Sequence, residues 1–175
     1  MMASTDRATL HSQQSCEWYT PRHIIDAARD VMGSIELDPA SCEEANAIIR
    51  AARYFDATTD GLSQSWTCET LWLNPPYGKR NGESLQAIWS QRLIAQYRHG
   101  LVGQACLLVN AMTGNRWFKP LWDYPLCFVD GRIRFVAPAA SGPKNQPTHS
   151  SVVVYFGGRH AAFERRFADL GRVIL

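Results

Sequence analysis

Leu71-Trp72-Leu73-Asn74-Pro75-Pro76-Tyr77-Gly78 is the stretch of this sequence that decides the fold. Its first three residues form a short apolar run that two prolines end, because proline donates no hydrogen bond to a sheet and disfavours a helical residue before it. We therefore expect a buried strand that stops at Asn74 and a rigid loop beyond it. At the carboxyl end of a parallel strand, such a loop lies where open α/β sheets bind their ligands.

The same loop carries groups suited to holding a flat base with an exocyclic amino group. That nitrogen is a poor nucleophile because its lone pair is delocalised into the ring, and two acceptors near its hydrogens would favour a more reactive, pyramidal nitrogen. The side-chain oxygen of Asn74 and the carbonyl of Pro75 are candidate acceptors, and Tyr77 could stack on a base extruded from a duplex. A rigid turn that only ends a strand remains the alternative for these residues alone.

Composition limits the classes of protein to consider. The 175 residues are 46% hydrophobic and 19% charged, which fits one globular domain with an ordinary core. A net charge of +2 permits a local nucleic-acid patch without arguing for one. The five cysteines are dispersed and include no CxxC pair, which disfavours a zinc site or a disulfide framework. We expect no bound metal, no membrane span and a cytoplasmic protein.

The amino-terminal part predicts a tail followed by a helix. Residues 1–16 are expected to be disordered, and residues 17–175 to form a single domain. Thr20 is a candidate N-cap, Pro21 fits the first helical position, and Gly33 fits the left-handed position after the last turn. Trp18 and Tyr19 either form a hydrophobic staple or cover a ligand at the mouth of this helix.

Two further loops follow predicted strand and turn signals. Residues 34–38 indicate a short strand, and residues 41–44 indicate a capping box at the start of the next helix. Asp38 would lie at the carboxyl end of that strand, where it could accept hydrogen bonds from a ligand ammonium or from the amides of its own loop. Residues 60–62 are typical of a turn.

The middle of the chain alternates helix and strand signals. Residues 79–82 form a basic stretch that suits phosphates or a solvated, flexible loop. Ser84 is expected to cap a helix that ends near Gly100, residues 104–109 to form a buried strand that ends at Asn110, and Thr113 to cap a short helix.

The carboxyl-terminal part predicts a hairpin, a loop, a strand and a helix. Residues 126–129 and 132–136 should form two strands joined by Asp130 and Gly131, with Arg132 and Arg134 on one face. Residues 137–149 are expected to form a functional loop or an insertion, residues 150–156 a strand, and residues 163–170 an amphipathic helix. Together the elements indicate an α/β fold with a mostly parallel sheet and its functional loops at one edge.

Several of these motifs, in this order, resemble the small phage and prophage DNA adenine-N6 methyltransferases of the Dam type. The similarity covers roughly residues 17–157 and rests on residues 18–21, 37–41, 46, 60–62, 66, 74–77, 131–135 and 150–157. It implies a reduced Rossmann-like methyltransferase fold that depends on S-adenosylmethionine. It also implies base flipping and direct transfer of a methyl group to the N6 amino group of adenine in DNA.

The resemblance also implies the roles of individual residues. The catalytic loop would comprise Asn74, Pro75, Pro76 and Tyr77. The cofactor would contact Tyr19, Thr20, Pro21, Asp38, Pro39, Ser41, Asp60, Leu62 and Asn74. DNA would contact Lys79, Arg80, Arg132, Arg134 and Lys144.

The sequence also departs from the pattern of this class. No glycine-rich loop follows the first strand, and the short segment between Ser41 and Trp66 implies that strands on the cofactor side are short or missing. With no room for a separate recognition domain, we expect a short or relaxed DNA target and a monomer or homodimer in a bacterial host cell. Alternatives are methylation of cytosine N4 in DNA, of adenine in RNA or of a protein glutamine, and a non-catalytic protein that binds nucleic acid.

Overall fold

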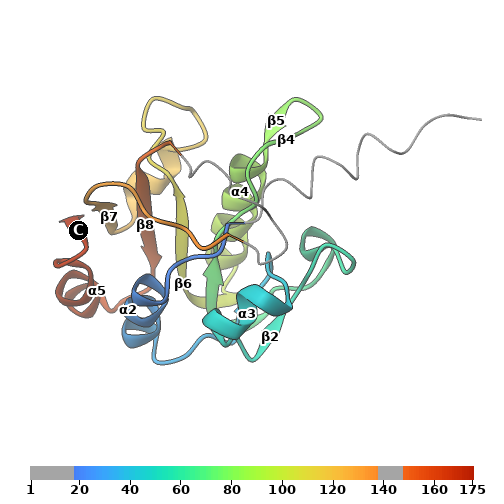
Figure 1. The fold of residues 1–175 in the computed structure, drawn as a ribbon, viewed down its shortest axis with the longest axis horizontal. Coiled ribbons are helices and arrows are strands. Elements are labelled where there is room, and N and C mark those ends of the chain that lie inside the picture. The colour runs from blue at the N-terminus through green and yellow to red at the C-terminus, as the bar shows by residue number, and fades with distance from the viewer. Residues whose placement is uncertain (1–17, 138–147) are drawn as a thin grey trace, which may run out of the picture.

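A seven-stranded sheet in the order β2-β1-β3-β6-β8-β7-β9 forms the centre of the protein (Figure 1). The computed structural model describes residues 18–137 and 148–175. Its strands are β1 (Leu37–Asp38), β2 (Arg53–Tyr54), β3 (Cys68–Leu73), β4 (Lys79–Arg80), β5 (Glu83–Ser84), β6 (Val102–Asn110), β7 (Leu126–Val129), β8 (Ser151–Phe156) and β9 (Gly171–Ile174). Its helices are α2 (Arg22–Met32), α3 (Glu43–Ile49), α4 (Leu85–Arg98) and α5 (His160–Phe167), with the 3-10 turns η1 (Gly61–Ser63) and η2 (Lys119–Asp123).

The sheet is parallel in one half and antiparallel in the other. Strands β2, β1, β3 and β6 are mutually parallel, whereas β8 is antiparallel to β6 and to β7, and β9 is antiparallel to β7. The predicted α/β class is confirmed. On the side of the sheet where the cofactor was expected, β1 and β2 are short as predicted, with two residues each.

The chain reverses its direction across the sheet between β1 and β3. From β1 it passes through α3 to β2 at the edge, and it then returns to the other side of β1 to form β3. A crevice opens at the carboxyl ends of the strands at such a switch point, and open α/β sheets bind ligands there. Asp38 ends β1 and Asn74 follows β3, so the two residues flank this point.

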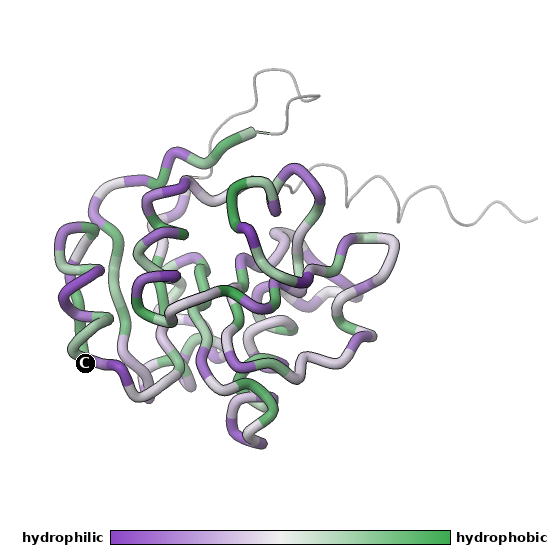
Figure 2. The backbone as a smooth tube through the Cα atoms, turned by 90° about the horizontal axis from the view of Figure 1, so that it is seen from below, coloured by the Kyte–Doolittle hydropathy of each residue, from purple (hydrophilic) through white to green (hydrophobic). Residues whose placement is uncertain are grey.

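Helices cover both faces of the sheet. One core contains the buried faces of α2, α3 and α5 together with Cys106 and Leu108 of β6, and the other contains α4 and η2 together with Leu107 and Val109. Successive strand residues point to opposite faces, so the apolar run of β6 supplies both cores. Figure 2 shows hydrophilic and hydrophobic residues alternating along the peripheral helices, as amphipathic packing requires.

The starts of α2, α3 and α4 agree with the sequence to within about a residue, but their capping differs, and α5 lies three residues earlier than the expected 163–170. Helix α2 has Pro21 at its N-cap, one residue later than expected, and Gly33 takes the predicted left-handed conformation with φ 91°. Helix α3 is capped by Cys42, whose sulfur accepts the N–H of Ala45, so the predicted capping box that starts at Ser41 is wrong. Ser84 precedes α4 as expected but makes no side-chain capping bond.

Two other expectations are corrected near the carboxyl-terminal half. Residues 132–136 form no strand beside β7, because β8 and β9 already occupy both edges of β7; only Val136 makes an isolated bridge, to Tyr19. Thr113 begins no helix, since residues 113–118 form turns and η2 starts at Lys119. The predicted amino-terminal tail and most of the predicted 137–149 loop lie outside the described residues.

The basic stretch after the Asn74–Tyr77 loop is a structured hairpin. Strands β4 and β5 pair antiparallel, and the two residues between them, Asn81 and Gly82, have φ values of 52° and 85°. Positive φ at both central positions is typical of a type I′ turn, which matches the twist of paired strands.

Candidate active site

The side chain of Asn74 has a defined orientation at the end of β3. Its amide nitrogen donates to the carbonyl oxygen of Trp18 at 3.0 Å and to the hydroxyl of Thr20 at 3.3 Å. A carbonyl oxygen can only accept, so the nitrogen of the amide must face Trp18. The side-chain oxygen of Asn74 accepts no hydrogen bond from any described residue.

The rest of the loop is rigid and presents an aromatic ring. Pro75 is buried, while Pro76 and Tyr77 are partly exposed, and all peptide bonds in the described residues are trans. Burial raises the pKa of Tyr77 to about 12, so its phenol is neutral at physiological pH. The carbonyl of Gly78 accepts the N–H of Leu85, which ties the end of the loop to the start of α4.

Asp38 is a buried carboxyl group at the neighbouring strand end. It is 1% exposed, and one of its oxygens accepts the N–H of Ala40 at 3.1 Å. Burial raises the pKa of Asp38 to about 7, although the Ala40 N–H and the Ser41 hydroxyl both favour its ionised form. The Ser41 hydroxyl lies buried without a well-aligned hydrogen bond in the described structure. A cationic partner would stabilise the ionised carboxylate further.

The segment before α2 connects these two strand ends. Besides the contacts of Trp18 and Thr20 with Asn74, the hydroxyl of Tyr19 donates to Glu44 of α3 at 3.0 Å. The Cys42 thiol lies 3.4 Å from the same hydroxyl. Trp18 is partly buried against the core. Residues 18–20 therefore connect Asn74 with the start of α3, whether Trp18 and Tyr19 act as a hydrophobic staple or cover a ligand.

The turn at residues 60–62 packs directly on the loop after β1. Asp60 has a φ of 47° and its carboxylate accepts the N–H of Leu62 at 3.2 Å. A Cβ on Gly61 would collide with the carbonyl oxygen of Pro39, so the two loops are in close contact. The indole of Trp66 donates to the carbonyl of Gly61 at 2.7 Å and holds the turn in place.

The structure therefore brings most of the predicted catalytic and cofactor residues to one edge of the sheet. Hydrogen bonds and packing connect Asn74 to Trp18 and Thr20, Tyr19 to the start of α3, and residues 60–62 to Pro39. Pro21 lies beside them as the N-cap of α2. No group of His, Cys, Asp or Glu residues in the described ranges could hold a metal ion.

The predicted DNA contacts do not form one cluster. Lys79 and Arg80 are exposed on the β4–β5 hairpin that follows the Asn74 loop, and Arg132 and Arg134 are exposed on a segment that reaches Tyr19 through Val136. The alternation in that segment is real even without a strand, since Ile133 and Phe135 are buried whereas Arg132 and Arg134 are exposed. Lys144 lies outside the described residues.

Two buried amides at the same edge were not predicted as site residues. Gln86, in the first turn of α4, accepts the N–H of Asn110 at 3.1 Å, and the side-chain oxygen of Asn110 is buried without a partner in the described structure. Asn110 was recognised only as a strand end. The polar Gln86 on the buried side of α4 was the available signal for the pair.

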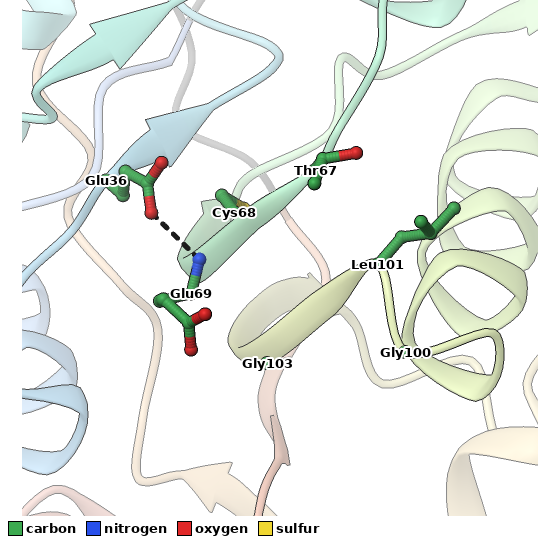
Figure 3. Close-up of a pocket in the computed structure, with 7 residues that line it drawn as sticks. All are labelled: Glu36, Thr67, Cys68, Glu69, Gly100, Leu101 and Gly103. Carbon is green, nitrogen blue, oxygen red and sulfur yellow. Dashed lines mark hydrogen bonds between the residues drawn. The ribbon is translucent and has the colours of Figure 1, made fainter.

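A cavity of about 370 Å³ lies at the opposite edge of the sheet and is separate from this site. The amino ends of β3 and β6 line it, together with Glu36, whose carboxylate accepts the N–H of Glu69 at 2.8 Å (Figure 3). Burial raises the pKa of the Cys68 thiol there to about 12, which makes it a poor nucleophile.

Comparisons with known proteins agree on one family. A family model described as DNA N-6-adenine-methyltransferase (Dam) matches residues 7–165. A DNA N-6-adenine-methyltransferase of Escherichia phage T1 is 29% identical over 102 residues, which cover 58% of this chain and 38% of the phage protein. The chain thus matches less than half the length of that relative.

Proposed function

The chain belongs to the DNA N-6-adenine-methyltransferase (Dam) family, and on this basis we propose that it methylates the N6 amino group of adenine in DNA with S-adenosylmethionine. The family match supports the reaction and the substrate class. The geometry at the switch point of the sheet supports an assignment of roles to individual residues. The sheet order, with its reversal between β1 and β3, also supports the finer proposal of a reduced Rossmann-like methyltransferase fold.

The orientation of Asn74 is the observation that carries the proposal. Both of its amide hydrogens have acceptors on residues 18–20, so its oxygen is left to accept a hydrogen bond from a ligand. An adenine amino group would donate one hydrogen to this oxygen and the other to the carbonyl of Pro75. The two hydrogen bonds would localise the nitrogen lone pair and direct it away from the ring.

Tyr77 would hold the base once it has left the duplex. Its ring is partly exposed and its phenol is neutral, which suits stacking on the flat face of an extruded adenine. Such stacking contributes about 1–3 kcal/mol per base. The buried Pro75 and the adjacent Pro76 restrict the backbone of the loop and so reduce the entropy lost when the base binds.

Asp38 fits the ammonium group of the cofactor. Its carboxyl group is buried, has one backbone hydrogen bond and has a pKa raised to about 7, so a cation would find an uncompensated acceptor there. The same strand ends are surrounded by the other residues proposed to contact the cofactor, namely Tyr19, Thr20, Pro21, Pro39 and Ser41. The adenosine part of the cofactor would contact Asp60 and Leu62. S-adenosylmethionine, when bound, supplies a methyl group activated by its positive sulfur.

The residues of this chain act by positioning. The new N–C bond would form as the S–C bond of the sulfonium breaks. The amino nitrogen must then lose one proton, which water beyond Asn74 would accept. Lys79 and Arg80 on one side, and Arg132 and Arg134 on the other, would contact the phosphates of the DNA. A monomer or homodimer remains our prediction.

Label transfer from S-adenosylmethionine to several substrates tests the function. Purified protein is incubated with DNA free of methylated adenine, with RNA and with a glutamine-bearing protein, and the products are hydrolysed. We expect label in N6-methyladenine from the DNA. Label mainly in N4-methylcytosine, in RNA or in glutamine would support a rival reaction, and no heat on calorimetric titration with the cofactor would indicate a non-catalytic protein.

A further inference from the structure

A second basic surface lies between α4 and η2. It surrounds a hollow of about 500 Å³ that is lined by Arg98, Arg116, Lys119, Pro120, Trp122 and Asp123. We call these six residues the η2 surface. None of them belongs to the predicted catalytic, cofactor or DNA-contact residues, and Asn74 does not line the hollow.

The charges on the η2 surface favour an anionic partner. Arg98 already has two partners within the protein. Its guanidinium donates to the Tyr124 hydroxyl at 3.3 Å and lies 3.5 Å from the Asp123 carboxylate. Arg116 and Lys119 are exposed and make no ion pair with any described residue. Two uncompensated cations therefore stand at one hollow.

Trp122 contributes an exposed aromatic ring, held by neighbouring rings, to this surface. This residue is 46% exposed. It is the one aromatic residue among the large exposed hydrophobics of the described structure. The ring meets Phe118 edge-on with centroids 5.6 Å apart, and it lies 5.8 Å from Phe128. These contacts restrict the ring, so little side-chain entropy would be lost on binding.

The loop that carries Arg116 begins at the same edge of the sheet as the Asn74 loop, and the η2 surface extends from this loop to Arg98 at the carboxyl end of α4. Strand β6 pairs with β3 in the register Leu73 to Leu107, so the loop that follows β6 leaves the sheet beside the Asn74 loop. Arg116 lies in that loop and Lys119 starts η2 directly after it. In Figure 1 this loop and the β4–β5 hairpin project beyond the same edge.

From these observations we propose that the η2 surface binds the sugar-phosphate backbone of the DNA that flanks the target base. Arg116 and Lys119 would each pair with a phosphate, while Trp122 would pack against the sugars between them. The inference rests on DNA being the substrate, as proposed above. It adds a contact that lies away from the extruded base and reads no sequence.

The composition of the surface favours DNA over a protein partner. Exposed tryptophan and arginine occur at both kinds of interface, but lysine is depleted in the centres of protein interfaces. Here three cations face one carboxylate around the hollow. A protein partner would leave Arg116 and Lys119 to be matched by added acidic groups, whereas a DNA backbone supplies a phosphate at each step.

Equilibrium binding to a labelled duplex of about 30 base pairs tests the proposal in about 100 mM salt. The double variant Arg116→Glu, Lys119→Glu should bind at least roughly tenfold more weakly, and its logarithmic salt dependence should be less steep by about two units, one for each lost phosphate contact. The control variant Arg165→Glu, Arg172→Glu makes the same change in net charge at exposed positions on α5 and β9. It should retain parental affinity.

Either of two results would overturn the proposal: parental affinity in the η2 variant, or an equal loss in the control. Methyl transfer by the parent, measured on the same long duplex, separates this proposal from the proposed function. If the parent binds the long duplex through Arg116 and Lys119 but transfers no methyl group, the proposed function fails while the binding surface stands.

Discussion

At the scale of single residues, the hydrogen bonds of Asn74 determine which atom of its amide is free, and the role proposed for this residue depends on that atom being the oxygen. Asn74→Asp keeps the acceptor oxygen but replaces the amide nitrogen with a second oxygen, which would face the carbonyl of Trp18. An unpaired buried acceptor costs about 1–3 kcal/mol, so we expect the single-turnover rate of transfer to fall roughly 10- to 100-fold.

Thr20→Val is the matched control for that substitution. It removes only the longer of the two hydrogen bonds, at 3.3 Å, and leaves the bond to Trp18 in place. Its rate should fall less than that of Asn74→Asp. A parental rate in Asn74→Asp would show that these hydrogen bonds do not orient the catalytic amide.

Asp38 predicts a pH dependence of stability. Its pKa is raised from 3.8, the ordinary value of an exposed aspartate, to about 7 in the fold, so between these values the folded state holds one proton more than the unfolded chain. Its contribution to the free energy of unfolding is therefore complete below about pH 4 and is lost as the pH rises towards 7, by at most roughly 4 kcal/mol.

Denaturant unfolding of the parent and of Asp38→Asn at several pH values measures this contribution. The difference in free energy of unfolding between the two proteins should shift in favour of Asp38→Asn as the pH rises from about 4 to 7. The comparison cancels the titration of the five histidines, which both proteins share. A difference that does not change with pH would contradict the buried, protonated carboxyl.

At the scale of elements, the close packing of η1 on the loop after β1 shapes the cofactor side. Gly61→Ala would drive a Cβ into the carbonyl of Pro39 and against the Trp89 ring, and neither can move freely. We expect a loss of about 1–3 kcal/mol in the free energy of unfolding and weaker binding of S-adenosylmethionine, both measurable by thermal unfolding with and without the cofactor.

Gly114→Ala is the control for Gly61→Ala, because a Cβ there would meet no atom within 4 Å. It should leave stability and cofactor binding unchanged. Equal behaviour of the two variants would mean that η1 can shift without cost, and the assignment of Asp60 and Leu62 to the cofactor would lose its support.

Helices and strands were predictable where a local signal decided the outcome. Apolar spacing and Gly33 located α2, and the prolines located the end of β3. The cap of α3 was not predictable, because Cys42 rather than Ser41 faces the first free N–H groups. The Asn81-Gly82 pair did signal a type I′ hairpin, but the charges beside it suggested a flexible loop instead.

At the scale of the whole molecule, sequence reasoning predicted the class of the fold but not its pairing. Residues 132–136 do alternate between exposed and buried side chains. They could pair with β7 as a strand only if β7 had a free edge. Strand β9 takes that edge, and nothing local in residues 171–174 distinguishes this partner from another. Such competition between distant segments is settled by tertiary packing rather than propensity.

The candidate site was predictable to the extent that strand ends mark it. Asp38 ends one strand and Asn74 follows another, and these two strands are neighbours in the sheet. The sequence gives the order of the two residues along the chain, but only the sheet topology shows that they lie at adjacent strand ends. The bonds from Asn74 to residues 18–20 and the buried Gln86–Asn110 pair depend on distances across the fold. The DNA-contact residues were less predictable, because exposed charges have no packing to fix their partners.

No helix of the described residues is both long and apolar enough to span a bilayer. Four cysteines lie in the described residues and are free thiols: Cys42, Cys68, Cys106 and Cys127.

The most direct test of the account is a paired measurement on Asn74→Ala. Methyl transfer to adenine in DNA and the affinity for S-adenosylmethionine are determined on the same preparation. The account predicts that transfer is abolished while cofactor affinity stays within about tenfold of the parent, because the amide holds the base and only adjoins the cofactor. Transfer that persists, or an equal loss of transfer and cofactor affinity, would contradict the central role of Asn74.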